Sequence, residues 1–327
     1  MALSIIWGVP YLFIKIAVEH LSPAGVVFVR TALAALLLLP LAAARGQLRP
    51  LLPHWRWVLL FAAVEIAVPF WMLGAAETRL SSSLTGLLVA TVPLLGALVA
   101  RVLRLEDGID RRRFTGLLVG IAGVAALVGV DVRGGDLLAV GAVLLAAAGY
   151  AVGPVVAALR LRGLPALGLP AVALAVTALA YAPLAWVTRP ADVRVVPGVA
   201  WASLAVLGVI CTAVAFLVFF ALVAEVGASR ATVITSVNPA VAVLLGVLVA
   251  GEPLTVGIAV GFPLVLLGSF LATRGPRRQS DGSDRSDPSG RSDEFDEGTA
   301  TTSATVSPAA SSGASPTSRA ASSGTSS

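Results

Sequence analysis

Residues 238–254 read NPAVAVLLGVLVAGEPL, and residues 92–107 read VPLLGALVARVLRLED. In each stretch a proline is followed by a glutamate 13 residues later, Pro93 by Glu106 and Pro239 by Glu252. The residues between each proline and its glutamate are predominantly apolar. This shared spacing indicates that one sequence unit occurs twice, at an offset of 146 residues.

Further matches extend this repeat in both directions. Under small changes of offset (143 to 146 residues) the matched pairs are Trp7 and Tyr150, Pro40 and Pro183, Phe70 and Phe216, Ser83 and Ser229, Gly116 and Gly261, and Gly123 and Gly268. The repeat covers nearly all of the apolar part of the chain, so we expect two related halves.

The composition predicts an integral membrane protein. Of the 327 residues 57% are apolar and 13% are charged, with a mean hydropathy of +0.92. Soluble domains carry roughly 25% charged residues, so this balance excludes a disordered chain, a collagen and an ordinary soluble enzyme. One cysteine and two histidines argue against a disulfide framework and a metal site.

The apolar residues fall into ten spans of about the length that a helix needs to cross a bilayer. The spans are residues 2–18, 24–44, 57–76, 82–100, 114–130, 136–159, 164–187, 198–222, 231–250 and 255–272. They are continuously apolar rather than alternating, which excludes a transmembrane β-barrel. We therefore expect an all-α membrane protein of ten transmembrane helices.

The spans divide into domains of five. Residues 1–130 form the first five-helix repeat, residues 131–273 the second, and the polar residues 274–327 a disordered tail. Because five is odd, the two repeats must cross the membrane in opposite senses, which predicts inverted repeats.

The arginines between the spans predict the orientation. If the N-terminus is cytoplasmic, the inside gaps carry 14 of these arginines and the outside gaps carry four. Positive residues favour the cytoplasmic side, so both termini are expected inside. These arginines are not interleaved with stacking aromatic residues, and we expect no nucleic-acid partner despite a pI near 10.3.

Ionisable residues inside apolar spans are costly, so each is a functional candidate. Lys15, Arg30 and Glu65 are such residues, and we expect them to contact substrate or a proton. A cationic pair of Lys15 and Arg30 suits a carboxylate or a phosphate, and Glu65 suits an ammonium group or a proton. Structural alternatives stay open: Lys15 snorkels beside Glu19, Arg30 pairs with Glu65 or with carbonyls, and Glu65 is a hydrogen-bonded structural carboxyl.

Other residues are expected to line a cavity or to shape the helices. Trp7, Tyr11 and Lys15 share one helical face. The cavity-lining candidates are Trp7, Tyr11, Pro93, Asn238 and Pro239, with packing as the alternative for the aromatic residues. Glu106 and Glu252 come just before the next helix begins, where a carboxylate stabilises the helix dipole, and they are expected to be structural.

These motifs resemble the drug/metabolite transporter superfamily, in its ten-helix branch built from two EamA domains. The matching residues are Trp7-Gly8, Lys15, Pro23, Arg30, Pro93 with Glu106, and Pro239 with Gly251-Glu252-Pro253-Leu254-Thr255. The resemblance covers residues 1 to about 273. It implies a carrier driven by a proton or other gradient, which moves small metabolites, frequently exporting amino acids, through a central cavity between the halves.

We therefore expect an inner-membrane exporter of amino acids or related small polar metabolites that works by alternating access. Its partners are the lipid bilayer, a small-molecule substrate and an ion gradient, without a cofactor. P-loop, H-E-x-x-H and G-x-S-x-G motifs are absent, and we expect no enzyme. Two alternatives stay open: a drug-efflux carrier, and a membrane sensor or enzyme that does not transport.

Overall fold

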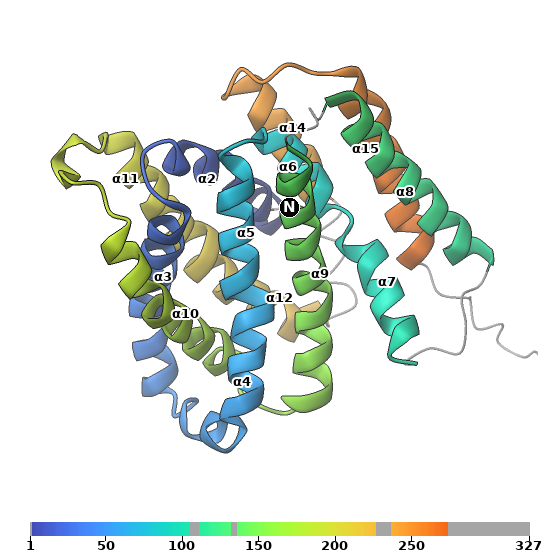
Figure 1. Ribbon diagram of the computed structural model, residues 1–327. Coiled ribbons are helices and arrows are strands. Elements are labelled where there is room, and N and C mark those ends of the chain that lie inside the picture. Colours follow the sequence, from blue (N-terminus) through green and yellow to red (C-terminus); the bar gives the residue numbers. More distant parts are fainter. Residues whose placement is uncertain (1, 105–110, 132–135, 227–236, 274–327) are drawn as a thin grey trace, which may run out of the picture. The chain divides into compact units, whose positions relative to one another are not determined.

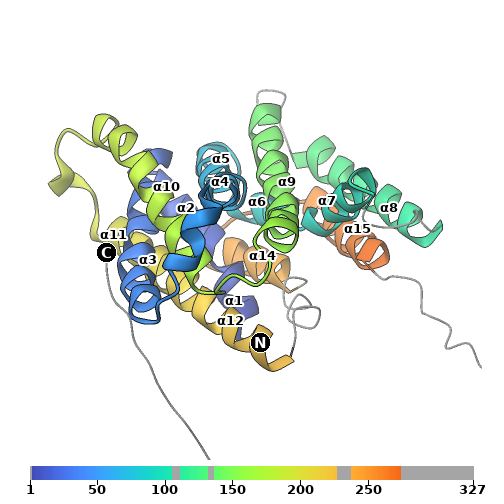
Figure 2. The ribbon, with the colours of Figure 1, turned by 90° about the horizontal axis from the view of Figure 1, so that it is seen from below.

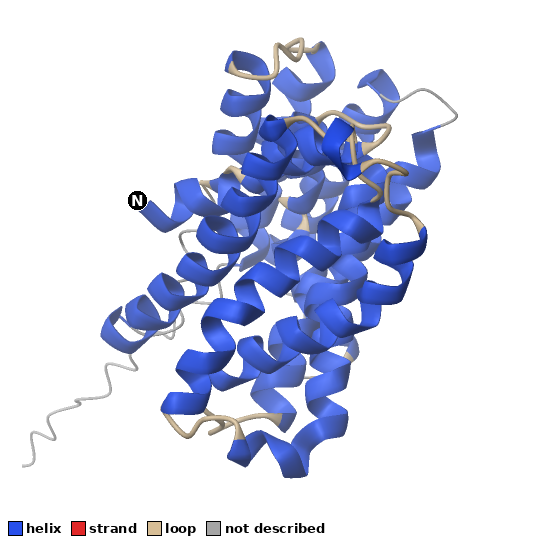
Figure 3. Ribbon diagram, turned by 90° about the vertical axis from the view of Figure 1, so that its left-hand side faces the viewer, coloured by secondary structure: helices blue, strands red, loops and turns tan. Residues whose placement is uncertain are grey.

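A computed structural model describes residues 2–104, 111–131, 136–226 and 237–273, and every regular element within them is helical (Figures 1 and 3). The first half contains α1 (Ala2–Gly8), α2 (Pro10–Val18), α3 (Pro23–Ala44), η1 (Arg49–His54), α4 (Trp55–Phe61), η2 (Ala62–Ala67), α5 (Val68–Glu77), α6 (Ser82–Val89), α7 (Val92–Val102) and α8 (Arg111–Asp131). Glu106 and the tail expected at 274–327 lie outside the described residues.

The elements of the second half follow a similar order, with the single helix α9 in the place of α1 and α2 and with no described helix in the place of α6. It contains α9 (Leu137–Arg160), α10 (Gly168–Val187), η4 (Val193–Val195), α11 (Gly198–Ala205), η5 (Val206–Val214), α12 (Ala215–Val226), α14 (Asn238–Leu248) and α15 (Val256–Thr273). Many large apolar side chains of these helices face outward, including Leu138, Leu179 and Trp186. Exposed apolar surface on so many helices is typical of a protein surrounded by lipid.

Seven helical segments are long and apolar enough to cross a membrane. They are Pro23–Ala44, Arg49–Glu77, Ser82–Val102, Arg111–Gly129, Leu137–Arg160, Gly168–Val187 and Gly198–Phe219. Three shorter apolar helices, Ile5–Val18, Asn238–Leu248 and Val256–Ala272, fall on the remaining expected spans. The all-helical, multi-pass character is thus confirmed, while ten complete crossings stay a prediction.

The two halves share irregular features at matching positions. The π-helices η2 and η5 both interrupt a long helix, and an offset of 146 places Ala62–Ala67 inside Val206–Val214. Pro93 and Pro239, which match at the same offset, both stand in the first turn of a helix, α7 and α14. Proline suits this place because its missing N–H has no intrahelical partner there.

Helices α3 and α10, which are counterparts in the repeat, pack against one another and run antiparallel. Ser22 Oγ before α3 lies 2.7 Å from Thr188 Oγ1 after α10. At the other end, Gly168 of α10 lies against Gln47, which follows α3; a Cβ at Gly168 would stand 2.5 Å from the Gln47 carbonyl oxygen. The start of one helix therefore meets the end of the other.

Helices α8 and α15 form the second antiparallel pair of counterparts, side by side in Figures 1 and 2. A Cβ added to Gly116 would stand 2.6 Å from Ala272 N, and one added to Gly123 would stand 2.7 Å from Val265 N. Small residues let helix backbones approach closely, so glycine is required along this contact.

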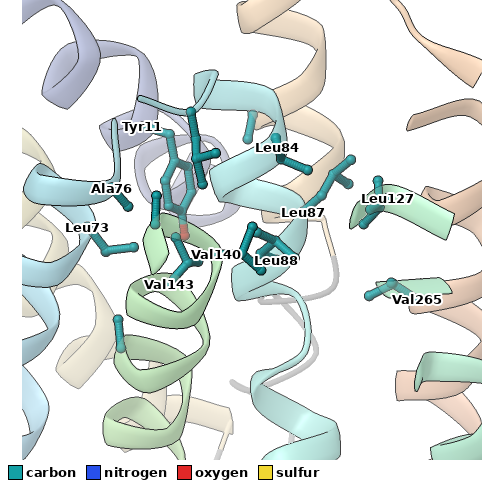
Figure 4. Packing of buried hydrophobic residues seen from close by; sticks show 14 of the residues in the cluster. Tyr11, Leu73, Ala76, Leu84, Leu87, Leu88, Leu127, Val140, Val143 and Val265 are labelled. Carbon is teal, nitrogen blue, oxygen red and sulfur yellow. The ribbon is translucent and has the colours of Figure 1, made fainter. Parts of the chain in front are cut away.

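Helices α6 and α14 also pack against one another, although the offset of 146 residues relates α14 to α7 and not to α6. Gly86 of α6 faces Ala242, and Ser83 faces Gly246, so the order along one helix reverses along the other. The cluster of buried side chains around α6 includes Leu84, Leu87 and Leu88, and Tyr11 of α2 lies between α5, α6 and α9 within it (Figure 4). This cluster joins elements of both halves beside the polar groups described next.

Candidate functional site

Arg30, in the second turn of α3, is the most buried basic side chain among the described residues, with 7% of its surface exposed. Its Nε donates to Thr212 Oγ1 at 2.9 Å, and the guanidinium carbon stands 3.9 Å from the centre of the Phe70 ring. The Thr212 hydroxyl in turn donates to the Leu207 carbonyl oxygen at 2.7 Å, five residues back along the π-helix η5. Thr212 of the second half therefore holds Arg30 at Nε, and Phe70 of α5 packs against one face of the guanidinium.

The terminal Nη groups of Arg30 make no hydrogen bond to any described residue. Tyr11 of α2, Tyr150 of α9, Glu77 and Cys211 lie within electrostatic reach of the guanidinium. The hydroxyls of Tyr11 and Tyr150 likewise have no hydrogen-bond partner among the described residues, and Figure 4 shows the Tyr11 hydroxyl pointing along α9 beside Val140 and Val143. Four donor N–H groups and two hydroxyls therefore remain available for an anionic or polar ligand.

Lys15 binds the end of a helix. Its Nζ donates to the carbonyl oxygens of Glu77, at 2.8 Å, and Leu80, at 3.2 Å, where α5 ends. The last carbonyls of a helix lack intrahelical donors, and a lysine near them also stabilises the helix dipole. Lys15 therefore binds the end of α5 rather than Glu19, the partner considered from the sequence. This contact fixes α2 to α5.

Glu65 stands in the π-helix η2, packed against Gly153 of α9, where a side chain would overlap the carboxyl group. Its Oε2 is buried and has no hydrogen-bond partner. Within the described part of the chain no ion pair joins it to Arg30, so that structural alternative is not seen.

Glu252 caps a helix of the other half. Its Oε1 accepts from Ser82 N at 2.6 Å and Ser82 Oγ at 2.9 Å, and its Oε2 accepts from Ser83 N at 2.9 Å and from Ser83 Oγ. A carboxylate at this end of a helix satisfies orphan N–H groups and stabilises the dipole. The helix is α6, however, and not α15, which follows Glu252 in the chain.

The remaining candidates lie around α1 and the starts of α7 and α14. The Trp7 ring packs against Phe219 with centroids 5.1 Å apart, and Asn238 lies against Gly8. Pro239 is buried and Pro93 is half-buried. These residues lie on helices near the boundary between the halves. That they line a cavity stays a prediction.

The sequence reasoning missed Glu77 and Tyr150. Glu77 was placed in a polar gap between spans, yet it is 0% exposed, and neither of its carboxyl oxygens has a hydrogen-bond partner. The signal that could have found Tyr150 is its match to Trp7 in the repeat.

Comparisons with known proteins agree with this architecture. The sequence model of the EamA-like transporter family matches residues 1–129 and 137–274. The chain is 30% identical over 286 residues to the uncharacterized inner membrane transporter YedA of Escherichia coli strain K12, covering 84% of this chain and 92% of that protein. The YedA proteins of strains O6:H1 and O157:H7 give the same values.

A solved crystal structure of another protein shares the fold. It superposes with a TM-score of 0.59 at 20% identity, over 83% of this chain and 94% of the other. The family match extends over both halves of the described helices. The chain therefore belongs to the EamA-like transporter family of the drug/metabolite transporter superfamily, and it is a multi-pass membrane transporter.

Proposed function

We propose that this transporter is a secondary carrier that exports small metabolites bearing a carboxylate, amino acids or related compounds first, by alternating access across the inner membrane. The observation that carries the proposal is Arg30, which is buried between the halves and whose Nη groups have no hydrogen-bond partner among the described residues. A planar guanidinium with free donors matches a carboxylate in a bidentate geometry.

The ten-helix inverted repeat is part of the same proposal. Two pairs of counterpart helices, α3 with α10 and α8 with α15, run antiparallel, as an axis in the membrane plane requires. Carriers built on such repeats bind substrate near the midplane between the halves. Arg30 from the first half, held by Thr212 from the second, lies at this boundary.

The orientation and driving force complete the proposal. Both termini are cytoplasmic by the distribution of arginines, and the YedA proteins are named inner membrane transporters. A proton or other ion gradient supplies the energy. Lys15 positions α2 against α5, and Glu65 is a candidate contact for a substrate ammonium group.

The test is counterflow by the full chain reconstituted in liposomes. Liposomes are loaded with each unlabelled proteinogenic L-amino acid in turn, and uptake of the same radiolabelled amino acid is followed. We expect transient accumulation of at least one of them. Arg30→Ala should lower this uptake about tenfold or more, because a charge-assisted hydrogen bond contributes on the order of 1.5–3 kcal/mol.

Arg189 offers a matched control. Its guanidinium also stacks on an aromatic ring, Trp186 at 3.6 Å, but the side chain is exposed. Arg189→Ala should leave uptake unchanged. Equal uptake by Arg30→Ala and the wild type contradicts the site. Efflux of a cationic dye that is independent of Arg30 assigns the drug-efflux alternative, and binding without counterflow assigns a sensor.

A further inference from the structure

A second group near Arg30 is not used by the anion site described above. Glu77 is the last residue of α5 and is 0% exposed, and neither of its carboxyl oxygens has a hydrogen-bond partner in the part of the chain that the structure describes. Transfer of a carboxylate anion out of water without donors is far more costly than transfer of the neutral acid. An unpartnered buried carboxyl therefore favours the protonated form.

We propose that Glu77 is the proton-binding carboxyl of this carrier, neutral in the conformation described and ionised when the halves rearrange. This rests on the proposed transport function and names the group that couples it to a proton gradient. In the step, the O–H bond of the Glu77 acid breaks, the proton passes to water, and the electron pair stays on the carboxylate.

The charges around Glu77 suit a group that changes state. Lys15 on α2 and Arg30 on α3 lie within electrostatic reach and attract a carboxylate, while Glu252, from the segment after α14, repels one. Tyr11 on α2 also lies within electrostatic reach of Glu77. Opposing contributions of this kind let a small movement of α2 or α14 change which form is favoured.

The contact with Lys15 links the proton to the position of a helix. Lys15 donates to the main-chain oxygen of Glu77 itself, so α2 is tied to the residue that titrates. Ionisation of the Glu77 carboxyl offers Lys15 a stronger acceptor than the neutral carbonyl. Lys15 can then exchange one acceptor for the other, which releases the end of α5.

A cavity lies beside the chain segment that follows Glu77, and Glu77 itself does not line it. This cavity of about 190 Å³ is lined by Arg79, Leu80, Ser81, Asp136, Pro253 and Thr255, beginning two residues after Glu77. On the predicted orientation the gap after α5 faces the outside. A proton entering from outside as substrate leaves is the direction that an exporter needs.

Glu65 does not share this environment. Its buried Oε2 also lacks a hydrogen-bond partner, but no lysine or arginine among the described residues donates to it. Without a nearby cation its carboxyl has nothing to stabilise the ionised form. The proposal therefore names Glu77 and not Glu65.

The experiment compares Glu77→Gln with the wild type in liposomes, by two readouts. The first needs no substrate: infrared spectroscopy follows the carboxylic-acid C=O band between pH 5 and pH 9. We expect a titrating component that is absent from Glu77→Gln and retained in Glu19→Gln, whose carboxyl is exposed at the end of α2. An unchanged titration in Glu77→Gln overturns the proposal.

The second readout is transport of radiolabelled L-amino acids with and without a pH gradient. Glu77→Gln should keep counterflow and lose at least tenfold of the accumulation driven by the gradient. Gradient-driven accumulation equal to the wild type overturns the proposal. If the wild type moves no amino acid, the proposed substrate fails, and the infrared result still decides the role of Glu77. Glu77→Asp, which keeps the carboxyl, should restore a titrating band if Glu77→Gln does not fold.

Discussion

Two carboxyl groups close to the α5–α6 turn have opposite surroundings. Glu252 accepts hydrogen bonds from the backbone N–H and hydroxyl groups of Ser82 and Ser83, whereas Glu77, five residues before Ser82, is buried without a donor. A carboxylate that accepts several hydrogen bonds stabilises a structure, whereas a buried carboxyl group without donors costs stability. The comparison shows that Glu252 stabilises the contact between the two halves. Glu77 makes no such contribution to stability, which is consistent with a role in proton binding.

The largest expected effect is the loss of the Glu252 carboxylate. Glu252→Ala removes the acceptors of two backbone N–H and two hydroxyl groups at the N-terminus of α6, and we expect a loss of about 3–5 kcal/mol in stability, because each group left without a partner costs about 1–3 kcal/mol. Unfolding in increasing SDS, followed by circular dichroism, measures it. Glu225→Ala removes an exposed carboxyl and should change nothing. If Glu252→Ala and Glu225→Ala unfolded at the same SDS concentration, Glu252 would not stabilise the contact between the halves, and it would no longer differ from Glu77 in this respect.

Overpacking of the α8–α15 contact tests whether apolar packing between the halves contributes as much stability as the Glu252 carboxylate. A Cβ at Gly268 would stand 2.5 Å from Gly120 N, and we expect Gly268→Leu to cost about 3 kcal/mol, near the upper end for overpacking. Gly129→Leu on α8, where no atom lies within 4 Å, is the control for the unfolding measurement. No loss in Gly268→Leu would show that α8 and α15 separate easily.

A smaller effect is expected at Lys15. Lys15→Met keeps much of the apolar stem and removes two hydrogen bonds to the carbonyls at the end of α5, which should cost about 2 kcal/mol. The same SDS titration checks it, with Arg45→Met as an exposed control. A stability equal to the wild type would argue that Lys15 does not hold α2 against α5.

The smallest effect is expected at Glu77. Glu77→Gln replaces a neutral acid by a neutral amide of similar shape, so stability should change by less than about 1 kcal/mol. Glu252→Gln, the same substitution at the saturated carboxylate, should cost clearly more in the same titration. A large loss in Glu77→Gln would mean that the Glu77 carboxyl is bound as Glu252 is.

The sequence was sufficient for features that repeat or that depend on composition. The apolar spans predict the helices, and the Pro–Glu spacing predicts the repeat to which α7 and α14 belong, although it placed Pro93 and Pro239 inside spans rather than at helix starts. Each of these signals lies within one stretch of chain or in a comparison of two stretches.

Features set by tertiary contacts were not accessible in this way. The partners of Glu252 lie 170 residues away, and the polar run from Glu77 to Arg79 suggested a solvated gap although α2 covers Glu77. The π-helices η2 and η5 also leave no mark in apolar spans that lack a clear polar face. Arg30 could be identified as a candidate, but its contacts with Phe70 and Thr212 could not.

The central claim is that the two halves are inverted copies around Arg30, and site-directed labelling of the loops after two counterpart helices tests it most directly. Arg45→Cys, after α3, and Arg189→Cys, after α10, are both exposed and are made with Cys211→Ser. A membrane-impermeant maleimide on intact cells should label Arg189→Cys at once and Arg45→Cys only after permeabilisation. Labelling of both residues from the same side would contradict the inverted arrangement.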